Sequence, residues 1–149
     1  MTTDARRKAV LAAAAAVREC ADTMEAQAGK VLGAIADVPM QAGLRVKTAD
    51  LFATLKDCAG RVTFEIALLE TELGRAQRPD PEATRALVGL DAKMMEALAP
   101  LAELADDLER AAEHDPEQEP AFVLVIESAG VMLQSLDRAR AATAAMAEG

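Results

Sequence analysis

The sequence predicts an all-α protein, an antiparallel up-down-up-down four-helix bundle with long helices and short loops. Hydrophobic residues make up 52% of the 149 residues and aromatic residues only 2%. Alanine, the strongest helix former, dominates the composition, and residues that favour strands are scarce. Apolar residues also recur at alternating steps of three and four in four successive segments, which is the heptad pattern of packed helices.

The first predicted helix spans residues 4–37 and ends before Pro39, because proline cannot join the hydrogen bonds of a helix interior. Every seventh position on its apolar face is alanine, three times in a row, which lets a neighbouring helix approach closely. We expect this helix to be a core member of the bundle. Its seam consists of Val10, Ala14, Val17, Ala21, Met24, Ala28, Val31, Ile35 and Val38.

The second predicted helix spans residues 41–77, and the third spans 81–113. Asp80 is a good N-cap for the third helix, and Pro81 suits its first position. Pro100 predicts a kink there, because the apolar pattern continues on both sides of it. The second seam is Leu44, Thr48, Leu51, Leu55, Cys58, Val62, Ile66, Leu69, Leu73 and Ala76, and the third is Ala83, Leu87, Leu90, Met94, Ala97, Leu101, Leu104, Leu108 and Ala111.

The fourth predicted helix spans residues 117–147, after a second proline-marked start at Pro116. Segments of matched length joined by short connections favour a single bundle domain over residues 1–149. The fourth seam consists of Phe122, Val125, Ala129, Met132, Leu136, Ala139, Thr143 and Met146.

The charge and the seams exclude several classes of function. A net charge of −9 argues against binding nucleic acid, which requires a basic face. The seams carry neither carboxylates nor histidine, so we expect no metal and no cofactor, and His114, the only histidine, is expected to be a solvated loop residue. No stretch approaches the ~20 apolar residues of a membrane span, which favours a cytoplasmic, bacterial-type protein.

Two cysteines lie at equal distances in sequence from the first predicted turn. Cys20 comes nineteen residues before Pro39, and Cys58 comes nineteen residues after it. In an antiparallel hairpin they would therefore lie at the same height. We expect two reduced thiols that pack as small apolar side chains, and a disulfide remains the alternative.

Partner binding is expected from apolar residues outside the seams and from an acidic segment. Residues 122–126 are apolar on every side of the predicted helix, so each side must pack against another surface. A second copy of the chain is the simplest candidate for the side that the bundle leaves exposed. Segment 103–119 holds eight acidic residues and one arginine, which suggests a basic partner. The expected partner-binding residues are Phe64, Leu68, Val123, Leu124, Val131, Asp106, Asp107 and Glu113.

These patterns favour a non-catalytic protein that acts through protein–protein interaction, as an adaptor, chaperone or regulator, and forms a homodimer. An alternative is a bundle that binds a lipid or polymer-granule surface. A third is an enzyme, either metal-dependent at the acidic segment or phosphatase-like, since Asp37 and Gln41 match a spacing used by bundle phosphatases.

Gly29 and Gly33 predict a close backbone contact with a neighbouring helix.

Overall fold

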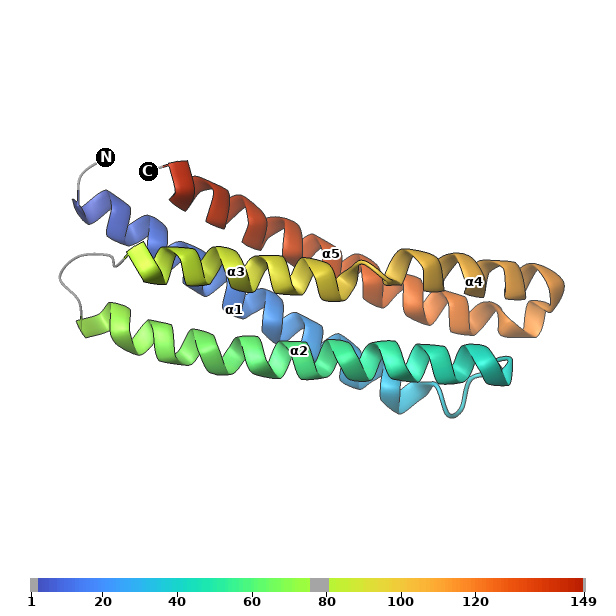
Figure 1. The fold of residues 1–149 in the computed structure, drawn as a ribbon. Helices are drawn as coiled ribbons and strands as arrows, with labels where there is room; N and C mark the ends of the chain where they lie inside the picture. The colour runs from blue at the N-terminus through green and yellow to red at the C-terminus, as the bar shows by residue number, and fades with distance from the viewer. Residues whose placement is uncertain (1–2, 76–80, 149) are drawn as a thin grey trace.

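The computed structural model describes residues 3–75 and 81–148. They form an all-α four-helix bundle, as predicted (Figure 1). The predicted seam residue Ala76 and the predicted N-cap Asp80 lie outside the described residues. The elements are α1 (Thr3–Ala34), α2 (Ala42–Arg75), α3 (Pro81–Leu98), α4 (Leu101–His114), a short 3₁₀ helix η1 (Pro116–Gln118) and α5 (Glu119–Glu148).

The helices alternate in direction and pack in a ring, with α3 and α4 together forming the third rod. Helix α1 packs against α2 and α5, and the third rod packs against α5 and α2, so that α2 and α5 lie diagonally opposite. Figure 1 shows the start of α1 and the end of α5 at one end of the bundle and the two short turns at the other. There the backbone N–H of Gln41 donates to Oε1 of Gln118, at 2.9 Å, and joins the two turns.

The buried residues form one core cluster that follows the predicted seams. From Val10 to Val31, every predicted seam residue of α1 is at most 1% exposed, which confirms its place in the core. Helix α2 departs from the prediction, since Phe52 and Ala59 are fully buried although neither lies on the predicted seam. The buried face of α2 is therefore rotated toward α1 relative to the predicted one.

The third predicted helix is interrupted rather than merely kinked. Helix α3 ends at Leu98 and α4 begins at Leu101, because Pro100 has no N–H to donate. Pro100 nevertheless has near-helical dihedral angles (φ −68°, ψ −10°), and its carbonyl accepts from the N–H of Leu104 at 3.2 Å. The two segments therefore continue as one jointed rod. Two other helix bounds differ from the predicted ones. Helix α1 ends at Ala34 rather than at residue 37, and α5 begins at Glu119 rather than at residue 117.

Two glycines in α1 do not have the expected role. Gly29 and Gly33 are exposed, and a Cβ atom at either position would meet nothing within 4 Å. The predicted close backbone contact at this pair is therefore wrong. The close packing of α1 comes instead from its alanines, of which Ala14, Ala21 and Ala28 are all buried.

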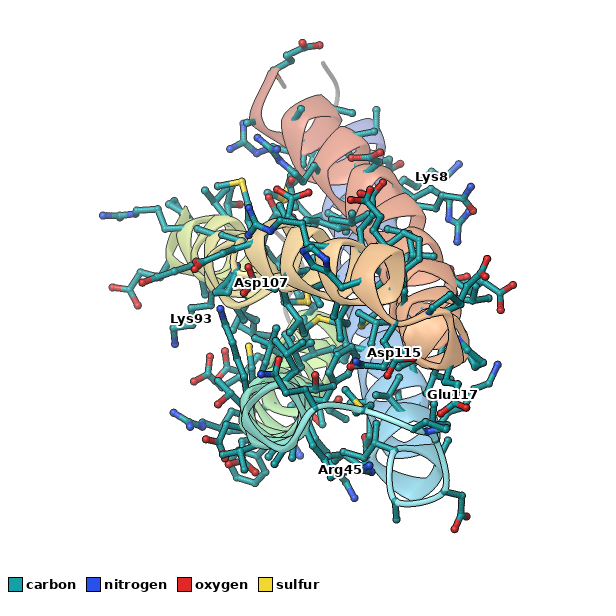
Figure 2. All side chains as sticks on the ribbon, turned by 90° about the vertical axis from the view of Figure 1, so that its right-hand side faces the viewer. Lys8, Arg45, Lys93, Asp107, Asp115 and Glu117 are labelled. Atoms are coloured by element: carbon teal, nitrogen blue, oxygen red, sulfur yellow. The ribbon has the colours of Figure 1, made fainter. Side chains whose placement is uncertain are left out.

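The end of α1 is capped by a side chain from α2. The guanidinium of Arg45 donates to the backbone carbonyls of Ile35 and Val38, the latter at 3.0 Å. Figure 2 shows Arg45 beside the turn that joins the two helices. The last carbonyls of a helix have no partner within it, so these bonds stabilise both the helix end and the turn.

One segment has the length and composition of a membrane-spanning helix. Within the described residues, Pro116–Glu148 contains a window of mean hydropathy 1.3, of which 39% is buried inside the bundle. The sequence-based expectation that no stretch is long and apolar enough is therefore wrong. In the bundle, this segment forms η1 and α5, and the buried side of α5 packs against α1 and the third rod.

Candidate functional site

A groove of about 660 Å³ runs between α2 and α3, within the size range of known ligand sites. Along α2 it extends from Asp50 to Glu65, which corresponds to about 22 Å at 1.5 Å per residue. It is thus elongated along α2. The lining residues are Asp50, Leu51, Thr54, Cys58, Arg61, Val62 and Glu65 from α2, and Leu90, Lys93, Glu96, Ala97 and Pro100 from the third rod.

The floor of the groove is a part of the apolar seam that the bundle leaves incompletely covered. Leu51, Cys58 and Ala97 are all predicted seam residues, yet each is only half-buried. On α2 the half-buried row continues with Leu44, so that Leu44, Leu51 and Cys58 follow one another at heptad spacing. Such a row has the periodicity with which helices pack against one another.

Charged side chains line both walls of the groove. Asp50 and Glu96 are exposed at the Pro100 end, and Arg61 is exposed toward the other end. In the described part of the chain, no ion pair within 4.0 Å involves any of these three residues. These charges are therefore available to an incoming molecule.

Two sets of ion pairs join α2 to the third rod. Near one end of the groove, Nζ of Lys93 lies 3.6 Å from Oε1 of Glu65. Beyond the other end, Nζ of Lys47 lies 2.6 Å from Oδ2 of Asp107 and 3.3 Å from Oε1 of Glu103. Figure 2 shows Lys93 and Asp107 on the side of the third rod that faces α2.

Both cysteines are free, in agreement with the expectation of reduced thiols. The Sγ of Cys58, in the floor of the groove, lies 4.0 Å from the carbonyl oxygen of Lys93. Burial raises the pKa of the Cys58 thiol, although Arg61 and Lys93 act in the opposite direction. Burial also raises the pKa of Cys20 to about 11. The raised pKa values favour the protonated form of both thiols at neutral pH.

Sequence reasoning missed a polar contact between α3 and α5. The side chain of Asp91 is only 14% exposed, and its Oδ2 lies 4.0 Å from Nε of Arg140. Its Oδ1 is buried and has no hydrogen-bond partner within the described part of the protein. Burial raises the pKa of Asp91. The only signal in the sequence was that Asp91 directly follows the seam residue Leu90.

The predicted apolar partner-binding residues do not form one surface. Phe64, which is 67% exposed, and Leu68 lie on α2, whereas Val123 and Val131 lie on the diagonally opposite α5. Leu124 is half-buried and packs against the core, which covers part of the run 122–126 within the bundle.

The predicted acidic surface is partly occupied by contacts within the chain. Asp106 and Glu113 are exposed on α4, but Asp107 binds both Lys47 and Arg110. These two cations lower the pKa of the Asp107 carboxyl. Only part of the acidic segment is therefore free to attract a basic partner.

The enzyme-like features do not converge on one site. Asp37 and Gln41 lie in the turn between α1 and α2 and not on one continuous helix, and His114 is the exposed last residue of α4. Within residues 3–75 and 81–148, no group of three or more His, Cys, Asp and Glu side chains could hold a metal ion.

The groove thus combines apolar surface with available charge, and a second hollow of about 660 Å³, lined in part by Val123 and Leu124, lies between the end of α1 and the start of α5. The floor of the groove is apolar, and its walls carry charges of both signs that have no ion-pair partner among the described residues. No protein-family model, curated protein or solved structure matches this chain.

Proposed function

We propose that this protein is a non-catalytic adaptor that binds an amphipathic helix of a partner protein in the groove between α2 and α3. The observation that carries the proposal is the half-buried heptad row Leu44, Leu51 and Cys58, two members of which line a groove open to solvent. Apolar surface with this periodicity is most fully buried by a helix with the same periodicity.

The dimensions of the groove support a helix as the occupant. A groove of about 22 Å accommodates four helical turns, and a bound helix would place anchors at positions i, i+3, i+4 and i+7 along it. An acyl chain could have a similar length but carries charge at one end only. Here Arg61 and Glu65 on one wall and Lys93 and Glu96 on the other present charge along much of the groove.

Other features fit an adaptor that acts in the cytoplasm. Two free cysteines are typical of a reducing compartment. The exposed acidic residues Asp106 and Glu113 would attract a basic partner and speed its association, since charges at the edge of an interface act mainly on the rate of encounter. A homodimer is a second candidate, favoured by the exposed Phe64 and Leu68 on the outer face of α2.

The proposal is tested with a synthetic amphipathic peptide of about 18 residues, built from Leu, Ala, Lys and Glu with one Trp on its apolar face. Because the chain contains no Trp and no Tyr, the fluorescence of the peptide reports binding without background. We expect saturable binding of one peptide per chain. Modification of Cys58 by the thiol reagent DTNB should slow at the same peptide concentrations, while the buried Cys20 should stay unreactive throughout.

A matched pair of variants places the binding in the groove. Thr54 and Thr71 are both exposed on α2, and each donates its hydroxyl to the carbonyl four residues earlier, at 2.9 and 3.0 Å. Only Thr54 lines the groove. Thr54→Arg should weaken peptide binding at least about tenfold, which corresponds to about 1.4 kcal/mol, whereas Thr71→Arg should leave it unchanged. Circular dichroism checks that both variants fold.

Several outcomes would contradict the proposal. Equal binding to both variants would place the peptide on another surface. Binding of a fluorescent fatty acid, but not of the peptide, would show a lipid site. A dimer in light scattering that Thr54→Arg dissociates would mean that a second copy of the chain covers the groove.

A further inference from the structure

We infer that the helix recognised by the groove is charge-polarised, with a basic residue at one end of its apolar stripe and an acidic residue about eleven positions away. This inference rests on the proposed function, because it specifies the chemistry of the partner at the same site. It follows from the unequal distribution of unpaired charge along the groove.

The Pro100 end of the groove is acidic. Asp50 from α2 and Glu96 from α3 both line this half, and both are exposed. The nearest cation on α2, Lys47, is bound to Glu103 and Asp107. Within residues 3–75 and 81–148, these two carboxylates therefore have no ion-pair partner, and Lys or Arg on the partner would supply the countercharge.

The other end of the groove has the opposite sign. Arg61 is exposed there and lacks an ion-pair partner among the described residues. The second cation, Lys93, is paired with Glu65, so these two side chains largely cancel. The unpaired charge of this half is therefore the single positive charge of Arg61, which an Asp or Glu of the partner would match.

The separation of the two charges sets the spacing in the partner. Asp50 and Arg61 lie eleven residues apart on α2, which corresponds to about 16 Å or three helical turns. A helix lying along the groove must place its basic and acidic side chains at about the same separation, on one flank of its apolar stripe. Its N-terminus, which carries about half a positive charge, is favoured at the Asp50 end.

The test compares three peptides that share the apolar stripe and one Trp. The first carries Lys near its N-terminus and Glu eleven residues later, the second has these two residues exchanged, and the third has Gln at both positions. Since an exposed ion pair contributes about a 1.4- to fivefold change, the first peptide, which forms two such pairs, should bind at least about twofold tighter than the third. The second should bind with intermediate affinity. About 0.5 M NaCl should remove the differences.

Protein variants assign the effect to the groove. The double variant Asp50→Asn with Glu96→Gln, and separately Arg61→Gln, should each reduce the preference for the first peptide over the third. Asp22→Asn is the matched control, because Asp22 is an exposed acid of α1 that does not line the groove. It should leave the preference intact.

The two proposals fail in different ways. If all three peptides bind equally and the double variant changes nothing, the charge inference is overturned while the groove remains a helix-binding site. If none of the peptides binds, the adaptor function itself is overturned. Tighter binding of the second peptide than of the first would overturn the assigned direction of the helix.

Discussion

The Nζ of Lys47 lies 2.6 Å from Oδ2 of Asp107, and this ion pair ties α2 to α4 just beyond the groove. Asp107 belongs to the acidic segment that the sequence suggested as a surface for a basic partner, but its side chain is only 22% exposed. Its charge is thus used to hold the third rod against α2. If the protein binds a basic partner as proposed, the acids that have no such contact are the ones that would recognise it.

Replacing Lys47 should change the titration of Asp107. The Lys47 ammonium and the Arg110 guanidinium hold the pKa of Asp107 below its ordinary value, so Lys47→Gln should raise this pKa. Because the folded-state pKa is lowered, the contact stabilises the protein above the ordinary carboxyl pKa and is lost as the pH falls through the lowered value. Carbon-detected NMR of the carboxyl group measures the shift. A pKa of Asp107 unchanged in Lys47→Gln would show that the contact does not persist in solution.

Asp91 should have the opposite effect on stability. Burial raises its pKa, so its ionised form destabilises the fold, and this penalty disappears as the pH falls through the raised pKa toward the ordinary value. Asp91→Asn should therefore raise the free energy of unfolding at neutral pH and flatten its dependence on pH in this window. Urea unfolding at several pH values measures both. The exposed control Asp57→Asn should stay within about 0.5 kcal/mol of the parent protein.

The two phenylalanines of α2 should differ sharply in their contribution to stability. Phe52 is fully buried, whereas Phe64 is 67% exposed. Phe52→Ala should lower the free energy of unfolding by about 3–5 kcal/mol, because it leaves a cavity in the core. Phe64→Ala should change it by less than about 0.5 kcal/mol. Urea titrations followed by circular dichroism measure both, and equal losses would contradict the assigned rotation of α2.

The small side chains of α1 should tolerate no enlargement. Ala21 is fully buried on the seam, and Ala26 is exposed on the same helix. Ala21→Leu should destabilise the bundle by about 1–3 kcal/mol, because extra methylenes must displace a packed neighbouring helix. Ala26→Leu should stay within about 0.5 kcal/mol of the parent protein. Tolerance of Leu at position 21 would mean that α1 and its neighbours are farther apart than the structure shows.

The helical rods were predictable because their signals are local. The heptad spacing from Val10 to Val31 identified the buried face of α1, since apolar periodicity and helix geometry are directly linked. The break at Pro100 was predicted only as a kink, because the seam residues Ala97 and Leu101 continue the pattern across it. The predicted close contact at Gly29 and Gly33 was wrong, because residue spacing alone does not show which face of a helix meets a neighbouring helix.

The groove could not be predicted, because it depends on how far neighbouring helices stand apart. Leu51, Cys58 and Ala97 have the same apolar character as fully buried seam residues, and only the packing leaves them half-covered. Asp91 was missed for a related reason, because a position beside a seam is exposed or buried according to the rotation of the helix. These are properties of the assembled bundle and not of any single segment.

The interruption at Pro100 gives the third rod a joint at one end of the groove. Helix α4 is fastened to α2 through Lys47, whereas the ring of proline removes the backbone hydrogen bond that would stiffen the junction. Helix α3 is itself joined to α2 by Lys93 and Glu65, and it buries Leu87 and Met94 in the core. The rod is therefore articulated at one point, while each of its two parts is anchored separately to the rest of the bundle.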